Sequence, residues 1–202
     1  MAQEGYWLAP EVRETMGAEV ELIGSPVLRQ VAPPIEDMDE ARKIADKLIE
    51  VLKHLDGAGL AAPQIGISAP IFVTHIKKTK KFPDRQEFPL EVFINPRILK
   101  YSEEKNYDWE SCFSVADHIG LVPRANCIVI EYTNYEGEKK HVEMTNPVQS
   151  RSTQHEYDHL QGLLYIDRLE SKNHYSSWKS QVKYAEHYQQ LKDRMNASVG
   201  AK

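Results

Sequence analysis

Residues 154–162 contain the pattern His-Glu-x-x-His, which requires a helix if both histidines are to bind one metal ion. On a helix, residues four positions apart lie on one face, so His155 and His159 can bind the same ion. Glu156 is not a third ligand at this spacing, but it is placed to take a proton from a metal-bound water. Roughly three chains per hundred of this length carry such a pattern by chance. On the motif alone, a polar surface helix with two unrelated histidines therefore remains an alternative.

The chain of 202 residues is long enough for one domain with a full core and short for two. Its net charge of −5 argues against a general nucleic-acid binder, and no apolar run approaches the ~20 residues of a membrane span. The first residues lack the pattern of a secretory signal or an organelle transit peptide. We therefore expect a cytoplasmic protein with no membrane or specific nucleic-acid partner, in which Cys112 and Cys127 are free thiols.

Two helices are predicted from local patterns. Apolar residues at three- and four-residue steps over residues 38–55 predict an amphipathic helix, with Asp37 or Asp39 as its N-cap. The Asn-Pro pair at 146–147 is typical of a helix start, and Gly162 is typical of a helix end. The two motif histidines therefore lie on a predicted helix.

The rest of the chain predicts mainly strands. The strand candidates are residues 71–76, 90–95, 97–101, 119–122, 127–132 and 138–144. Pro96 separates the second candidate from the third, and residues 57–66, rich in glycine and alanine, predict a tight helix-to-strand connection. A basic loop spans 77–88. A final helix spans 178–195, and its predicted apolar face consists of Val182, Ala185, Tyr188 and Leu191.

These elements together predict an α+β fold. Antiparallel strands pack around a central metal-binding helix, with an N-terminal amphipathic helix and a C-terminal helix. We expect a single domain over residues 1–202, with an irregular N-terminal extension at 1–20 and a C-terminal helix and tail at 172–202.

Two histidines leave a metal short of ligands, because a hydrolytic site usually has three protein ligands and one open position. Another histidine, a carboxylate or a cysteine could complete the set. Cys112 is expected in a loop among polar neighbours, whereas Cys127 opens an apolar strand and is better explained as a small core residue. Cys112 is therefore the better candidate of the two cysteines.

Three segments resemble, in order, the three motifs of the peptide deformylase family. They read GAGLAAPQ at 57–64, ESCFS at 110–114 and QHEYDH at 154–159. The resemblance extends to residues 26–29, 93–96 and 160–167, so it covers roughly residues 20–170. Three motifs in the right order are far more specific than the histidine pair alone.

The resemblance implies a fold similar to the predicted α+β arrangement and an enzyme that removes the formyl group from the N-terminal methionine of nascent chains. It implies that Cys112, His155 and His159 bind one divalent metal, natively Fe(II), with Zn, Ni or Co able to occupy the same site. Glu156 is then the general base and acid. Gln64 and the backbone N–H of Phe113 are then the donors to the oxyanion.

The same resemblance implies contacts with a formyl-methionine peptide. Gly59 has no side chain, so we expect a peptide to hydrogen-bond along the backbone of Gly59 and Leu60 as an added strand. Glu110 is expected to form part of the wall of the methionine pocket, with Arg124 either its ion-pair partner or a plain surface arginine.

The chain departs from the family pattern at two positions of the second motif, where glycine and leucine are usual and Ser111 and Phe113 stand here. The backbone N–H at position 113 does not depend on the side chain. We expect Ser111 to strain a turn that glycine tolerates, and Phe113 to narrow or reshape the mouth of the pocket.

Two other functions fit parts of the pattern. A protease with the same histidine motif is disfavoured by Cys112 as third ligand, and a catalytically silent deformylase-like binding domain is disfavoured by the intact Glu156 and Gln64. The lysines of the C-terminal helix fit weak docking on the ribosome, as the resemblance to some family members implies, but a solvated amphipathic helix packed on the domain is the better explanation.

Overall fold

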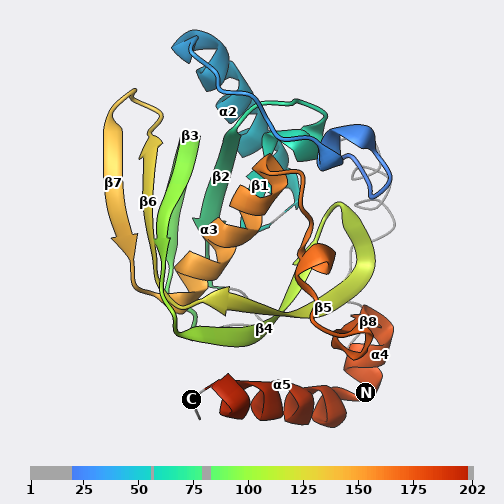
Figure 1. Ribbon diagram of the computed structural model, residues 1–202. Helices are drawn as coiled ribbons and strands as arrows, with labels where there is room; N and C mark the ends of the chain where they lie inside the picture. The colour runs from blue at the N-terminus through green and yellow to red at the C-terminus, as the bar shows by residue number, and fades with distance from the viewer. Residues whose placement is uncertain (1–19, 56, 79–82, 200–202) are drawn as a thin grey trace.

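The computed structural model describes residues 20–55, 57–78 and 83–199 (Figure 1). The predicted irregular extension at 1–20 therefore lies outside the described residues except for Val20. Part of the predicted basic loop (79–82) and the end of the tail (200–202) lie outside them as well.

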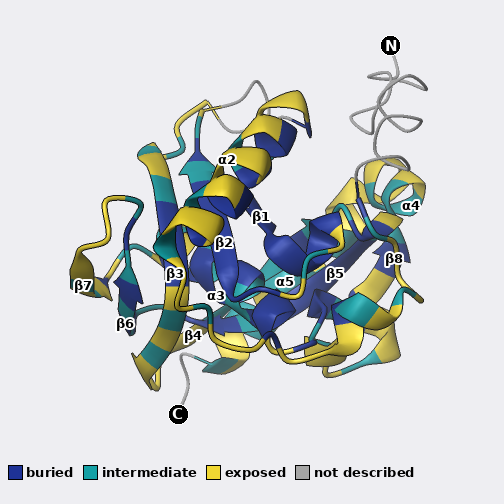
Figure 2. Ribbon diagram, turned by 90° about the horizontal axis from the view of Figure 1, so that it is seen from above, coloured by how far each residue is buried: buried dark blue, intermediate teal, exposed yellow. Residues whose placement is uncertain are grey.

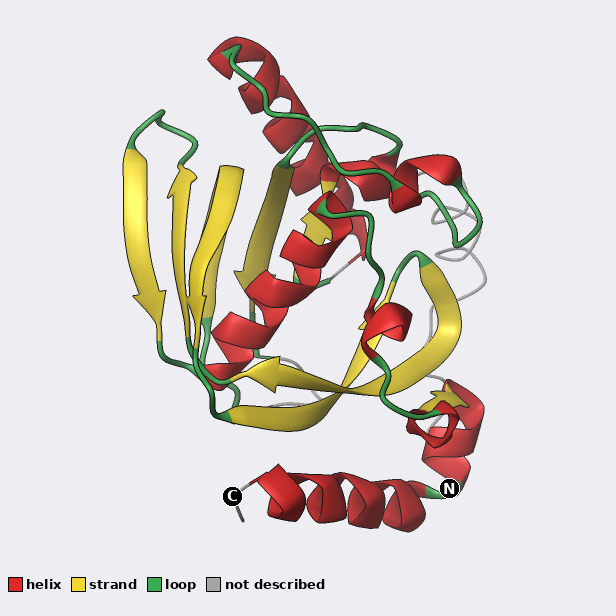
Figure 3. Ribbon diagram, in the orientation of Figure 1, coloured by secondary structure: helices red, strands yellow, loops and turns green. Residues whose placement is uncertain are grey.

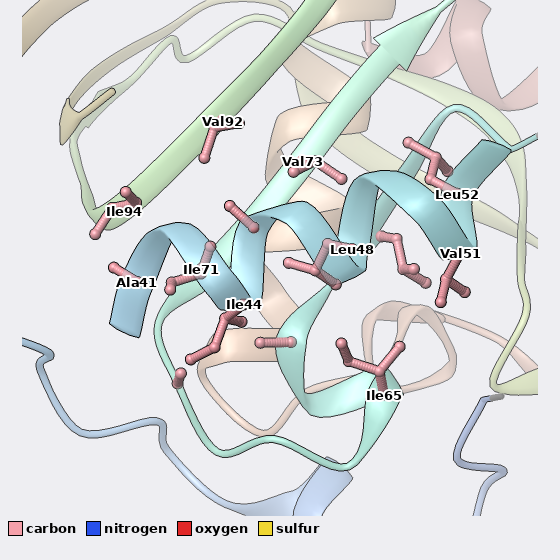
Figure 4. Packing of buried hydrophobic residues seen from close by; sticks show 14 of the residues in the cluster. Ala41, Ile44, Leu48, Val51, Leu52, Ile65, Ile71, Val73, Val92 and Ile94 are labelled. Carbon is pink, nitrogen blue, oxygen red and sulfur yellow. The ribbon is translucent and has the colours of Figure 1, made fainter. Parts of the chain in front are cut away.

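Helix α2 (Met38–Leu55) has the bounds that the sequence predicts. Asp37 is its N-cap, because its Oδ1 accepts hydrogen bonds from the N–H groups of Asp39 and Glu40 at 2.9 and 3.1 Å. The apolar face of α2 is buried against the main sheet, and its opposite face is exposed (Figures 2 and 4). Burial of this face, rather than helix propensity alone, fixes the helix in place.

The main sheet is antiparallel, with strand order β1-β2-β3-β6-β7. Its strands are β1 (Gly59–Ala61), β2 (Ile71–Ile76), β3 (Phe88–Tyr101), β6 (Ile128–Thr133) and β7 (Lys139–Met144). Alternate side chains of β2 and β3 point to opposite faces. Ile71 and Val73 pack with α2, whereas Phe72 stacks on Phe93 on the other face at a centroid distance of 4.4 Å.

The prediction that Pro96 ends a strand is wrong. β3 runs through Pro96, and the pairing of β3 with β6 shifts register between Ile94 and Arg97. A proline has no N–H to donate, so a strand can contain it only where the ladder is interrupted. Asn95 takes a positive φ of 49° here and exchanges two hydrogen bonds with the backbone of Ile35.

A second antiparallel sheet has the order β4-β5-β8, formed by β4 (Lys105–Cys112), β5 (Val115–Ala125) and β8 (Tyr175–Ser177). The sequence predicts only residues 119–122 of this sheet. Cys112 therefore ends a strand rather than lying in a loop, which corrects the expectation. Among the described residues only Asn95 and Asp117 combine a side chain with a positive φ, so Ser111 is not strained as expected.

Helix α3 (Pro147–Leu160) carries both motif histidines and lies between the two sheets, in contact with β1, β2 and β5 (Figures 1 and 3). Its start is confirmed, because the Asn146 side chain accepts hydrogen bonds from the N–H groups of Val148 and Gln149. Gly162 follows its end with a φ of 70°. Most of the buried residues of α3 are polar, so this helix needs hydrogen-bond partners on both sides.

The C-terminal segment is not one helix as predicted. Its helices are α4 (Trp178–Lys183) and α5 (Ala185–Val199), separated at Tyr184, whose φ of −120° and ψ of 41° are not helical. Because of this break, the residues of the predicted apolar face do not share one environment: Val182 is exposed, whereas Tyr188 is half-buried. Short 3₁₀ helices complete the fold: η1 (Pro26–Arg29), η2 (Ala62–Ile65), η3 (Tyr165–Arg168) and η4 (Lys172–His174). None of the described helices has the length and apolar character needed to cross a membrane.

Candidate active site

Cys112, His155 and His159 come together although they lie on different elements. Each offers one ligand atom, and these atoms lie within 4.8 Å of one another. The Cys112 Sγ is 3.3 Å from Nε2 of His159, and all three residues are shielded from solvent. A thiolate and two imidazoles form a donor set that suits Zn and Fe(II), so the three residues fit a single divalent metal. No other such group occurs among the described residues.

Glu156 is buried beside this ligand group and against strand β1. A Cβ at Gly59 would lie 2.5 Å from its Oε1, so only glycine at position 59 leaves room for the carboxyl group. Burial raises the pKa of Glu156 to about 7, and its Oε2 has no hydrogen-bond partner among the described groups. A carboxyl group with a pKa near neutrality can both accept and deliver a proton at physiological pH.

Gln64 is fixed so that its amide nitrogen faces the ligand group. Its Oε1 accepts a hydrogen bond from the N–H of Ala61 at 2.9 Å. Its Nε2 is therefore directed to Cys112 Sγ at 3.4 Å and to Ser114 Oγ at 3.3 Å. The side chain is 1% exposed, and the 3₁₀ turn η2 that carries it ends at Gly66 with a φ of 78°. The glycine- and alanine-rich connection thus presents one polar side chain to the site.

Phe113 lies in the short turn between β4 and β5. Its ring lies over Gly57, where an added Cβ would meet Cε2 and Cζ at 2.6 Å, and it packs against the core cluster that includes Leu52. The aromatic ring therefore joins the second motif to the first. Leu60 is fully buried in the same cluster and pairs with Val73 of β2, so its side chain belongs to the core.

Glu110 lies behind His155. Its Oε2 accepts a hydrogen bond from Nδ1 of His155 at 2.8 Å and one from Arg124 Nη2 at 2.9 Å. Its Oε1 accepts from Arg124 Nε at 2.9 Å and from Arg151 Nη1 at 2.6 Å. Both oxygens are thus engaged in this network, and the place of Glu110 in the wall of the methionine pocket stays a prediction. The predicted ion pair with Arg124 is confirmed.

Three charged residues around this pair were missed in the sequence. Arg124 also donates to Asp158 at 2.5 Å, and Arg168 donates to the other oxygen of Asp158 at 2.7 Å. The Arg151 guanidinium bonds Asn106 of β4 as well as Glu110. The sequence did contain a signal for two of them. Arg151 precedes His155 by four residues and Asp158 follows it by three, so all three lie on one side of a helix.

The network keeps buried charges fully paired. Burial raises the pKa of Glu110, but the Arg124 charge and the hydrogen bonds from His155 and Arg124 outweigh it and hold that pKa well below its usual value. Burial lowers the pKa of His159, and the charges of His155 and Arg124 lower it further, which keeps its imidazole neutral. A neutral imidazole is the form that binds metal.

The fold and this group of side chains define a metal-dependent hydrolase. The family model for polypeptide deformylase matches residues 18–175. Peptide deformylase 2 of Nostoc sp. is 38% identical over 151 residues, which are 74% of this chain and 84% of that protein. The peptide deformylase of Rhizobium meliloti is 40% identical over 149 residues, which are 73% of this chain and 82% of that protein.

A solved structure of a peptide deformylase is similar to this chain as well. The class I type b peptide deformylase from Acinetobacter baumannii, bound to Met-Ala-Ser, is 31% identical and superposes with a TM-score of 0.70 over 74% of this chain and 96% of its own. The chain belongs to the peptide deformylase family. It is a metal-dependent hydrolase that removes the N-formyl group from the N-terminal formyl-methionine of nascent polypeptides and releases formate. These findings do not favour a catalytically silent binding domain.

The hydrogen bond from His155 to Glu110 generates a prediction for Glu110→Gln. This change removes the charge that pairs with Arg124 and orients His155, so the metal affinity should fall by about 10–100-fold. The free energy of unfolding should fall by about 3–5 kcal/mol, because buried arginine charge is left uncompensated. Chelator competition with Zn(II) and urea unfolding measure the two effects.

Glu138→Gln is the matched control, because Glu138 is an exposed glutamate paired with Lys140. This control should leave the metal affinity unchanged. Equal affinities in Glu110→Gln and the parent protein would contradict the role of Glu110.

Proposed function

We propose that Cys112, His155 and His159 hold the catalytic metal, natively Fe(II), and that Zn, Ni or Co can replace it. The single observation that carries this proposal is the convergence of the Cys112 sulfur and the imidazoles of His155 and His159, whose ligand atoms lie within 4.8 Å of one another. When bound there, the metal lowers the pKa of a water molecule, so that a nucleophile is available at neutral pH.

Glu156 acts as the general base and then as the general acid. Its carboxylate takes the proton from the attacking water and delivers it to the nitrogen of the leaving peptide. The raised pKa of about 7 and the absence of a competing partner on Oε2 among the described groups support this role. The space that Gly59 leaves allows the carboxyl group to lie at the edge of β1.

The oxyanion that forms from the formyl group is stabilised by the Gln64 amide and the backbone N–H of Phe113. The support for the role of Gln64 is geometric. The hydrogen bond from the Ala61 N–H to Oε1 fixes the Gln64 amide, so that its Nε2 faces Cys112 before any substrate binds. A donor oriented in advance costs no reorganisation during the reaction, which is why such donors accelerate acyl transfer.

The substrate is a formyl-methionine peptide that lies along β1 as an added strand. In the part of the chain that the structure describes, β1 is at the edge of the main sheet and β2 is its one neighbouring strand. The backbone groups of Gly59 and Leu60 are thus the ones next to Glu156 that can pair with a peptide. The Met-Ala-Ser peptide bound to the Acinetobacter baumannii relative supports a substrate of this kind. We also assign to Glu110 the orientation of His155, beside its expected place in the wall of the methionine pocket.

A cytoplasmic location follows from the substrate, because nascent chains are made there. Weak ribosome docking through the C-terminal helices would use their exposed basic residues, Lys179, Lys183 and Arg194. Lys192 is not one of them, because its ammonium group bonds Asp108 of β4 at 2.5 Å.

The role of Glu156 predicts the behaviour of Glu156→Gln. Glutamine keeps the shape of the side chain but cannot take up a proton, so kcat/KM for formyl-Met-Ala-Ser should fall by about 10²–10⁴-fold. Formate release from iron-loaded protein measures the effect, with metal content determined in parallel. Glu143→Gln, an exposed glutamate of β7, is the control. Undiminished turnover in Glu156→Gln would exclude it as the base.

The position of Phe113 predicts a change in substrate preference. Phe113→Leu removes the ring from Gly57 and opens the space beside β1, while the backbone N–H remains. We expect the ranking of formyl-peptides by kcat/KM to change and the metal content to stay constant. An unchanged ranking across peptides that differ in their first two side chains would show that the Phe113 ring does not contact the substrate.

A further inference from the structure

Strand β4 connects the proposed metal site to the C-terminal segment. Within the described residues it is an edge strand of the second sheet, paired with β5 alone, and it carries both Glu110 and Cys112. Successive side chains of a strand point to opposite faces. Asn106 and Glu110 share the face toward α3, where Arg151 bonds them both. One face of β4 is therefore occupied by the network behind the ligands.

Helix α5 lies along the outer edge of β4 (Figure 1). The Asn196 amide accepts a hydrogen bond from the N–H of Tyr107 at 2.8 Å and donates one to the Tyr107 carbonyl at 3.0 Å. These two bonds are the pair that a neighbouring antiparallel strand would supply. One asparagine side chain thus completes the hydrogen bonding of the edge strand at this position.

Further contacts hold the same stretch of β4. The Tyr107 hydroxyl donates to Glu170, and the Lys192 ammonium group bonds Asp108 at 2.5 Å. The ring of Trp109 meets that of Tyr188 edge to face, with centroids 5.5 Å apart. Three consecutive residues of β4 are therefore bound by the C-terminal segment.

The attachment of α5 differs from ordinary core packing. The half-buried residues of α5 form one helical stripe: Tyr188, Leu191, Lys192, Met195, Asn196 and Val199. None of its residues is fully buried, so directed polar contacts to β4 determine where it sits. The match to the family model ends at residue 175, so α5 lies beyond the part of the chain that defines the family.

We propose that α5 is a positioning element for the metal site, with Asn196 as its central positioning residue. Asn196 fixes the backbone of β4 at Tyr107, five residues before Cys112 and three before Glu110. Movement of β4 would displace the thiolate and also the carboxylate that orients His155. This inference rests on the proposed function, in which Cys112 and His155 are metal ligands.

The test compares Asn196→Ala and Asn196→Asp with the parent protein after loading with Co(II). Aspartate keeps the acceptor for the Tyr107 N–H but loses the donor to its carbonyl, so its effects should be intermediate. Gln190→Ala is the matched control, because Gln190 is exposed on α5 and bonds only Glu186 of the same helix. The readouts are the thiolate-to-cobalt absorption band, the rate of metal release to a chelator, and kcat and KM for a formyl-peptide.

In Asn196→Ala we expect a shifted thiolate-to-cobalt band and a lower kcat with unchanged KM. Metal release should be faster by about tenfold, which is the lower end of the effect of losing an outer partner of a metal ligand. Gln190→Ala should match the parent protein. If Asn196→Ala does not fold, a band and a release rate in Asn196→Asp equal to those of the parent protein overturn the inference.

The outcomes separate the two proposals. A parent protein without a thiolate-to-cobalt band contradicts the proposed ligand set and the positioning role with it. A parent band that stays unchanged in both Asn196 variants, with unchanged metal release, contradicts the positioning role alone and leaves the ligand set intact.

Discussion

The Glu110 carboxylate, buried with four hydrogen bonds from Arg124, Arg151 and His155, is the interaction on which the site depends. A buried charge is tolerated only when it is paired and hydrogen-bonded, so these partners must be in place together. The carboxylate belongs to β4, whereas its partners belong to β5 and α3. The network therefore joins the helix with the histidines to the strand with the cysteine, and it orients the His155 imidazole.

The site also requires that helix α3 and strand β1 approach each other closely. Helix α3 lies against β1 so tightly that a Cβ at Gly59 would collide with Glu156, and a Cβ at Gly57 would collide with the ring of Phe113. These two glycines allow the first motif to carry Gln64 up to the sulfur of Cys112. The site is therefore a junction between the two sheets, with α3 between them (Figure 1).

The sequence predicted the elements whose signals are local. Helix α2 has a regular apolar face and an N-cap, and the spacing of His155 and His159 needs only a helix to bring them together. Strand β4 was missed, because its inward residues are polar and bond α3 instead of packing as an apolar row. The break at Tyr184 was missed as well, since neither glycine nor proline marks it. The partners of Glu110 depend on tertiary contacts that no local pattern contains, although Arg151 and Asp158 lay at helical spacing from a recognised ligand.

X-ray absorption at the zinc edge of the zinc-loaded protein counts the sulfur and nitrogen neighbours of the metal, and so it tests whether Cys112, His155 and His159 bind one ion together. We predict one sulfur at about 2.3 Å and two imidazole nitrogens at about 2.0–2.1 Å from the metal. We also predict that the sulfur signal disappears in Cys112→Ser. A metal with only nitrogen and oxygen neighbours in the parent protein would contradict the assignment of Cys112, and with it the architecture in which β4 and α3 together hold the metal.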